Sequence, residues 1–241
     1  MSEPLELVIF DCDGVLVDSE PICNGVLAQM LGEMGWVLSL QQTVDRFMGR
    51  SLAQCVQGIE QHFGRPVPTD FLPQLAERTQ GALQGQLKAV AGIEAVLDGL
   101  TVPYCVASNG NRAKMNTTLG MTGLLPRFIH RMFCAGDVAR PKPAPDLFLH
   151  AAQTHGARPE RCVVVEDTPT GILAARAAGM RALGHAAMMP APRLLQAGAH
   201  AVFTRMSELP ALLWPPGASD EVMALAKDTI PNPNPNQRDS P

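Results

Sequence analysis

Hydrophobic residues along this chain occur in short strand-like runs that alternate with longer helix-like stretches. Apolar and β-branched runs that predict strands lie at 7–10, 102–108, 133–137 and 162–167, with weaker ones at 181–183 and 201–204. Apolar residues with helical spacing lie between them, at 93–100, 112–119, 143–156 and 170–178. Strands that alternate with helices predict βαβ units. The pattern therefore predicts an α/β fold with a Rossmann-like, three-layer core around a central parallel sheet.

A helical region interrupts this alternation directly after the first strand. Helical spacing is found at 22–34, at 51–63 with Ser51 as the N-cap, and more loosely at 71–87. No strand-like run separates these three stretches. We therefore expect a small, all-helical domain inserted after the first strand.

The change of pattern also sets the domain boundaries that we predict. Residues 1–18 and 89–213 form the Rossmann-like core, and residues 19–88 form the helical cap. From residue 214 the composition turns to proline, asparagine, serine and aspartate. Such a composition buries little apolar surface, so residues 214–241 are predicted to be a disordered tail.

Polar side chains lie where several of the predicted strands end. They are Asp11 and Asp13, Ser108 and Asn109, Lys142 between two prolines, and Glu166 with Asp167. Residues i and i+2 of an extended segment point the same way, so the first two aspartates are presented together. The carboxyl ends of parallel strands meet at one edge of a sheet, where open α/β sheets bind their ligands.

This set of residue types favours phosphate chemistry beside a metal ion. Several carboxylates in one place repel one another and require a cation, and oxygen ligands with room for water suit Mg²⁺. A hydroxyl and a lysine beside such a metal can bind a phosphoryl group, and an aspartate can attack phosphorus to form an aspartyl-phosphate. Taken alone, the Asp-Gly pair at the first strand is equally consistent with an ordinary acidic turn.

Four motifs in order carry a resemblance to a known family. They read DxDGVLVDSE, ASNG, RPKPAPD and VVVEDTPTG, and together they resemble the haloacid dehalogenase-like superfamily over roughly residues 5–213. The chain looks closest to the β-phosphoglucomutase-like sugar phosphatases with a small helical cap. It is also similar to the 6-phosphogluconate phosphatase-like members of that branch.

The resemblance implies a metal site and a nucleophile. Asp11 would attack phosphorus and bind Mg²⁺, and Asp167 would also bind the metal. Glu166 would be a direct or water-mediated partner of the metal. Asp13 would bind the metal through its main-chain carbonyl, while its side chain would protonate the leaving oxygen and then take a proton from water.

The resemblance further implies a phosphate site and a reaction. Ser108, Asn109 and Lys142 would hold the phosphoryl oxygens, and Lys142 would also stabilise the charged Asp11. The implied reaction is Mg²⁺-dependent hydrolysis of a small phosphorylated metabolite. A sugar phosphate or a phosphosugar acid such as 6-phosphogluconate is the expected substrate class.

Some residues keep two interpretations. Arg50 follows Gly49 near a cap helix and is either a ligand for the distal anionic end of the substrate or an exposed helix arginine. Arg112 and Lys114 pose the same question. Asp18 is expected to shape the cap hinge rather than to contact substrate.

Two alternative functions stay open. A β-phosphoglucomutase-type mutase is the nearer one, but Cys23 stands where such relatives often have a histidine that assists the mutase, which argues against it. A non-catalytic binding protein on the same fold is the remote one. It predicts degraded motifs, whereas the motifs here are intact.

Composition narrows the expected partners. The net charge of −4 and the 5% aromatic content argue against nucleic acid, which requires a basic face and stacking rings. There is no basic leader and no apolar run near the roughly 20 residues that span a bilayer. The six cysteines are widely spaced, which suits reduced thiols in a cytoplasmic protein. A monomer is the simplest expectation.

Overall fold

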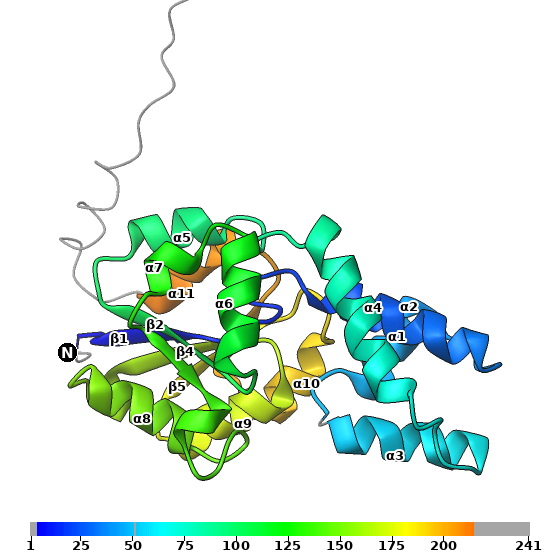
Figure 1. Ribbon diagram of the computed structural model, residues 1–241. Coiled ribbons are helices and arrows are strands. Elements are labelled where there is room, and N and C mark those ends of the chain that lie inside the picture. The colour runs from blue at the N-terminus through cyan, green and yellow to red at the C-terminus, as the bar shows by residue number, and fades with distance from the viewer. Residues whose placement is uncertain (1–3, 51, 215–241) are drawn as a thin grey trace, which may run out of the picture.

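The computed structural model describes residues 4–50 and 52–214, and its centre is a six-stranded parallel sheet (Figure 1). The strands are β1 (Leu7–Phe10), β2 (Tyr104–Ser108), β3 (Met132–Cys134), β4 (Cys162–Glu166), β5 (Arg181–His185) and β6 (Ala201–Phe203). Their order across the sheet is β3-β2-β1-β4-β5-β6, and all neighbouring pairs are parallel. The chain therefore runs outward from β1 in both directions, which creates a topological switch point beside β1. The predicted α/β fold is confirmed.

Helices cover both faces of the sheet and complete a three-layer core. One face carries α5 (Ile93–Gly99), α6 (Arg112–Met121), α7 (Leu125–Phe128) and α11 (Leu209–Leu213), and the other carries α8 (Asp146–Thr154), α9 (Pro169–Ala177) and α10 (Ala191–Gln196) (Figure 1). Successive strand residues point to opposite faces. Strand β1 accordingly sends Val8 and Phe10 into one apolar cluster and Leu7 and Ile9 into the other, all fully buried.

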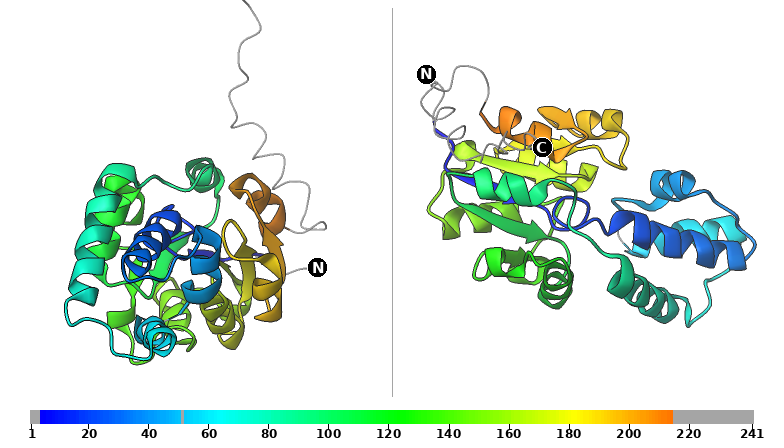
Figure 2. Two further views of the ribbon diagram at one scale, coloured as in Figure 1. Left: turned by 90° about the vertical axis from the view of Figure 1, so that its right-hand side faces the viewer. Right: turned by 90° about the horizontal axis from the view of Figure 1, so that it is seen from above.

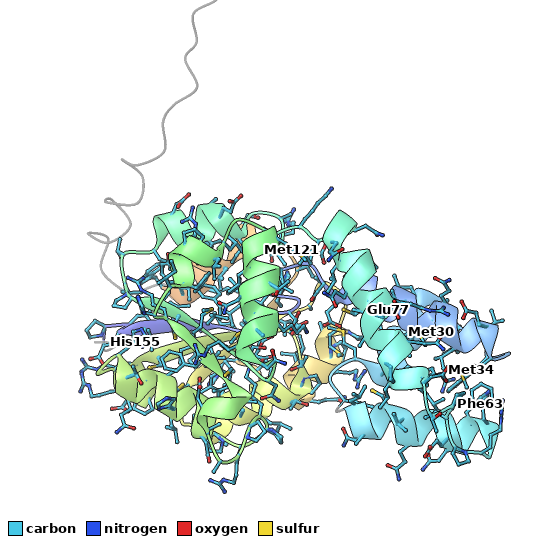
Figure 3. All side chains as sticks on the ribbon, viewed as in Figure 1. Met30, Met34, Phe63, Glu77, Met121 and His155 are labelled. Atoms are coloured by element: carbon cyan, nitrogen blue, oxygen red, sulfur yellow. The ribbon has the colours of Figure 1, made fainter. Side chains whose placement is uncertain are left out.

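Four helices form a separate lobe beyond the carboxyl ends of the strands (Figures 1 and 2). They are α1 (Glu20–Glu33), α2 (Leu40–Phe47), α3 (Leu52–Phe63) and α4 (Phe71–Gln86), and we call them the helical lobe. The lobe has its own apolar cluster, which includes Leu31, Ile59 and Phe71. Figure 3 shows Met30 of α1 and Met34, directly after this helix, in the lobe, whereas His155 lies at the far end of the core.

The two connections to the helical lobe leave the core side by side. Val17 forms an antiparallel bridge with Ala89, and the amide of Asp18 donates to the main-chain oxygen of Lys88 at 2.9 Å. Asp18 itself is exposed and lies in the first connection. The lobe is thus attached to the core through one short, two-stranded hinge.

The lobe also contacts the core away from the hinge. Val44 and Met48 at the α2 end of the lobe are buried in the apolar cluster beneath α9 and α10. The hydroxyl of Thr170 donates to the main-chain oxygen of Gly49 at 2.9 Å. These contacts place the loop after α2 against the start of α9.

Several elements differ from the sequence prediction. Helix α2 was not predicted, nor were the short helices α7, α10 and α11. The strand predicted over 133–137 covers Met132–Cys134, and Ala135–Asp137 is a 3₁₀ turn because the Asp137 carboxylate accepts from the amide of Cys134 at 2.8 Å. The predicted N-cap Ser51 and residues 215–241 of the predicted tail lie outside the described residues, while Trp214 packs partly buried against the core.

Two bulk properties can be compared with the structure. All six cysteines are free thiols, four of them buried. Among the helices of residues 4–50 and 52–214, none has the length and apolar character needed to cross a bilayer.

Candidate active site

A buried lysine connects the ends of three neighbouring strands. The Lys142 ammonium donates to Asp11 Oδ1 at 2.6 Å, to Glu166 Oε1 at 2.7 Å and to the main-chain oxygen of Ala107 at 2.7 Å. These acceptors come from the carboxyl ends of β1, β4 and β2, which meet at the switch point. The Lys142 side chain is only 3% exposed, so its charge is balanced by carboxylates rather than by water.

Burial and neighbouring charges have opposing effects on the pKa values of Asp11 and Lys142. Burial raises the pKa of Asp11 to about 7, although Lys142 lowers it. Burial alone would lower the pKa of Lys142, but the carboxylates of Asp11 and Glu166 outweigh burial and raise the pKa above its ordinary value. The lysine therefore stays protonated, and its charge favours the ionised form of the Asp11 carboxylate.

The start of α9 fixes the Glu166 carboxylate. Glu166 Oε2 accepts from the amide of Thr168 at 3.0 Å and from its hydroxyl at 2.8 Å. Thr168 is the N-cap of α9, with Pro169 at the first helical position, a combination that suits a helix start. A Cβ at Gly171 would overlap the Glu166 carboxylate, so the close approach requires glycine at this position.

Asp167 offers an oxygen without a partner. Its Oδ1 is the one buried side-chain oxygen or nitrogen of the described residues that lacks a hydrogen bond. Burial raises its pKa well above the usual range, and the nearby Glu20 and Glu166 carboxylates raise it further. Its other oxygen lies over Gly14, which has φ +73° and no room for a side chain.

These carboxylates fit a divalent cation. Ligand oxygens of Asp11, Glu166 and Asp167 all lie within 4.8 Å of one another. Both oxygens of Glu166 already accept hydrogen bonds from Lys142 and Thr168. Asp11 and the unpartnered Asp167 are therefore the better direct ligands, and Glu166 is suited to holding Lys142.

The second strand contributes a hydroxyl and an amide. Ser108 is buried at the end of β2, and its Oγ accepts from the amide of Gly110 at 3.0 Å. The Asn109 side chain donates to the main-chain oxygen of Lys142 and accepts from its amide, each at 3.0 Å. The Asn109 side chain is therefore bonded to the Lys142 backbone, and the phosphate-binding roles of Ser108 and Asn109 stay predictions.

Both oxygens of the Asp13 carboxylate are hydrogen bonded. Ser19 Oγ donates to Oδ1 at 2.7 Å, and the Lys114 ammonium donates to Oδ2 at 2.8 Å. Ser19 is fully buried at the N-cap position of α1, but its hydroxyl makes no cap bond. Sequence reasoning missed Ser19, because the linear pattern gives no sign that this hydroxyl faces Asp13.

Of the two arginines with open roles, one is paired with an aspartate outside this cluster and the other is exposed. The Arg112 guanidinium donates to Asp137 at 2.7 Å and to the main-chain oxygen of Met132 at 3.0 Å. Arg50 is exposed on the loop that touches α9. Of these open residues, Lys114 is the one that the structure joins to a predicted catalytic side chain.

The fold and this site together define an α/β enzyme with a carboxylate-rich centre at the switch point of a parallel sheet. Comparison with known proteins agrees with this class. A family model for haloacid dehalogenase-like hydrolases matches residues 5–179. The chain is 32% identical over 209 residues to a 6-phosphogluconate phosphatase of Escherichia coli, covering 86% of this chain and 94% of that protein.

Two solved structures are similar over most of the chain. A haloacid dehalogenase-like protein of Agrobacterium tumefaciens has a TM-score of 0.82 at 38% identity and covers 87% of this chain and 97% of its own. A haloacid dehalogenase family hydrolase of Deinococcus radiodurans, solved with bound phosphate and sodium, has a TM-score of 0.77 at 35% identity and covers 88% and 96%. The chain belongs to the haloacid dehalogenase-like hydrolase family. The predicted family, its branch and the assignment as an enzyme are confirmed.

Proposed function

We propose that this hydrolase is a phosphatase that cleaves small phosphomonoesters through an aspartyl-phosphate at Asp11. The observation that carries the proposal is the buried Lys142, whose ammonium joins Asp11 to Glu166 at the switch point. A buried lysine beside the nucleophile keeps a carboxylate charged in a site where burial otherwise favours its neutral form. The same ammonium provides positive charge for the phosphoryl oxygens.

The first half-reaction transfers the phosphoryl group to the protein. A carboxylate oxygen of Asp11 forms the new bond to phosphorus while the bond to the ester oxygen breaks. The side chain of Asp13, two residues further on, gives a proton to the leaving oxygen. Ser108 Oγ binds a phosphoryl oxygen, the Lys142 ammonium supplies positive charge beside the phosphoryl group, and Asn109 keeps the Lys142 main chain in place.

The second half-reaction returns the nucleophile. Asp13, now ionised, takes a proton from a water molecule that attacks the phosphorus of the aspartyl-phosphate, and inorganic phosphate leaves. The helical lobe lies beyond the site and serves as a cap over it, so that water is excluded during the first step and admitted for the second.

Asp11, Asp167 and the main-chain carbonyl of Asp13 would hold Mg²⁺, with Glu166 as an indirect partner. The unpartnered, buried Asp167 Oδ1 supports this assignment. When bound, Mg²⁺ supplies positive charge that offsets the carboxylates and the transferring phosphoryl oxygens.

A sugar phosphate or a phosphosugar acid is the substrate class that we propose. The support is the likeness over most of the chain to a protein named 6-phosphogluconate phosphatase, together with the phosphate bound in the Deinococcus hydrolase structure. The test is phosphate release from a panel that includes 6-phosphogluconate, hexose and pentose phosphates, phosphoglycolate and nucleotides, with Mg²⁺ and with EDTA. We expect metal-dependent release concentrated on one or two sugar phosphates.

Asp11→Asn tests the mechanism on the same panel. The amide is a poor nucleophile, so we expect turnover to fall by about a thousandfold or more while the fold is kept. Asp98→Asn is the matched control, because this carboxylate is largely exposed and pairs with Arg127 away from the site. Undiminished turnover by the Asp11 variant would contradict the mechanism. Conversion of β-glucose 1-phosphate to glucose 6-phosphate without free phosphate would indicate a mutase instead.

A further inference from the structure

A lysine from the core reaches the carboxylate that we assign as the general acid. Lys114 Nζ lies 2.8 Å from Asp13 Oδ2, and the two side chains are 43% and 18% exposed. Asp13 lies after β1, and Lys114 lies 101 positions further along the chain, in the first turn of α6. This lysine is not part of the four motifs named above or of the assigned phosphate site.

The lysine is carried by a rigid part of the fold. Its amide donates at 2.8 Å to the side chain of Asn111, which caps α6. Met115 and Leu119 of the same helix, one and five positions further on, are buried in the core. The starting point of the Lys114 side chain is therefore fixed relative to the sheet and does not depend on the position of the helical lobe.

Among residues 4–50 and 52–214, Lys114 forms an ion pair with Asp13, although other acids are near. The Glu20 carboxylate, which also faces this region, is held by the Asn24 side chain at 3.0 Å. Partial burial would lower the pKa of Lys114, but the Asp13 carboxylate outweighs burial and raises it, so the lysine is charged. The buried thiol of Cys12 and the partly buried thiol of Cys23 also lie near Lys114.

We propose that Lys114 is a positioning residue for Asp13, because its ammonium and the Ser19 hydroxyl each hold one carboxylate oxygen and so fix the direction from which that carboxyl group meets the leaving oxygen. Each carboxylate oxygen has a second lone pair, so both bonds are compatible with a proton carried on Asp13. The proposal rests on the proposed function, in which Asp13 is the general acid. Lys114 acts through Asp13 and does not contact the phosphoryl group.

The leaving group separates this role from phosphate binding. An alkyl phosphate such as a sugar phosphate needs a proton on its leaving oxygen, whereas 2,4-dinitrophenolate leaves without one. For Lys114→Met we expect kcat on the best sugar phosphate to fall by about 10- to 100-fold with KM within about threefold. The pre-steady-state burst of dinitrophenolate from 2,4-dinitrophenyl phosphate should change by less than about threefold.

Three further variants complete the test. Lys114→Arg keeps the charge and should recover most of the sugar phosphate turnover. Arg112 lies in the same helix turn but pairs with Asp137. Arg112→Met should therefore leave the turnover of both substrates unchanged. In a double-mutant cycle, Lys114→Met should add less than about twofold to the loss caused by Asp13→Asn.

The outcomes distinguish this inference from the function on which it rests. Undiminished sugar phosphate turnover by Asp13→Asn would overturn both. A large loss in Asp13→Asn with normal turnover in Lys114→Met would overturn the positioning role alone. Equal losses on the alkyl and dinitrophenyl substrates would also overturn it, because such losses indicate phosphate binding or damaged folding.

Discussion

Lys142 shows how a single buried cation allows an acidic site to exist inside a folded protein. Its ammonium makes three hydrogen bonds of 2.6–2.7 Å, two of them to carboxylates that are almost fully buried. Removing one partner of a buried ion pair leaves an uncompensated charge, which costs more than the pair itself contributes. Lys142 is thus a residue whose structural and chemical roles cannot be separated.

Lys142→Met should lower stability in a pH-dependent way. Without the lysine, the folded-state pKa of Asp11 rises further above its unfolded value, so folding then binds protons. The added cost is absent below the unfolded pKa and is fully present above the folded pKa. We expect the free energy of unfolding, measured by urea titration in EDTA, to fall by about 3–5 kcal/mol at pH 8 and by clearly less at pH 5.

Arg140→Met is the control for this experiment. Arg140 lies two positions earlier, and its side chain is 70% exposed in a surface pair with Asp146. Its removal should change stability by about 1 kcal/mol or less at either pH. A loss in Lys142→Met that is the same at pH 5 and pH 8 would mean that the buried carboxylates do not respond to the missing charge.

At the scale of elements, the first turn of α9 links local helix capping to the site. The Thr168 hydroxyl accepts from the amide of Gly171 at 3.2 Å and donates to Glu166, which in turn accepts from Lys142. Loss of the Thr168 hydroxyl therefore removes two hydrogen bonds. One caps α9, and the other holds Glu166, which binds Lys142.

Thr168→Ala should cost about 1–2 kcal/mol of stability, the usual range for loss of an N-cap hydroxyl. Turnover should also fall, because Glu166 loses a donor that orients it. Thr168→Ser keeps the hydroxyl and should stay close to the wild type in both measurements. Chemical denaturation and steady-state kinetics on the three proteins check this, and a Ser variant as impaired as the Ala variant would rule out the capping hydroxyl as the cause.

The longer strands and helices could be predicted from the sequence, whereas the shortest helices could not. Strand β4, for example, is a β-branched run bounded by polar residues, and α3 has helical spacing over several turns. The short helices α7, α10 and α11 contain four to six residues, fewer than a periodic pattern requires. Helix α2 did carry a local sign, since Ser39 and Gln42 form a capping box.

The bonding partners in the site could not be predicted in the same way. The motifs identified Asp11, Asp13 and Lys142, because residue type and strand position were visible in the sequence. The links from Asp13 to Ser19 and Lys114 depend on how α1 and α6 are placed against the sheet. That placement results from packing of the core and leaves no mark in a linear pattern.

At the scale of the whole molecule, the acidic site should make folding, protons and metal interdependent. Burial raises the pKa of Asp11 to about 7 and that of Asp167 well above its usual value. The metal-free protein therefore loses stability as pH rises through about 7. A bound divalent cation favours the charged carboxylates and opposes this loss.

We expect Mg²⁺ to raise the melting temperature more at pH 8 than at pH 5, because protons on Asp11 and Asp167 compete with the metal. Differential scanning fluorimetry with MgCl₂ or with EDTA at both pH values measures the effect. Asp167→Asn removes a proposed ligand and should abolish most of the increment at pH 8. An increment that is equal at both pH values would contradict competition between protons and metal at these carboxylates.

The paired connections at Val17 and Ala89 have a consequence for how such a protein can diversify. A segment whose two ends lie side by side can be lengthened, shortened or exchanged at little entropic cost to the rest of the chain. The proposed catalytic side chains lie in the core, mostly in loops at the carboxyl edge of the sheet, whereas the helical lobe has its own apolar cluster. The helical lobe can therefore be exchanged or remodelled to give new substrate preferences, while the core and its phosphate chemistry are inherited unchanged.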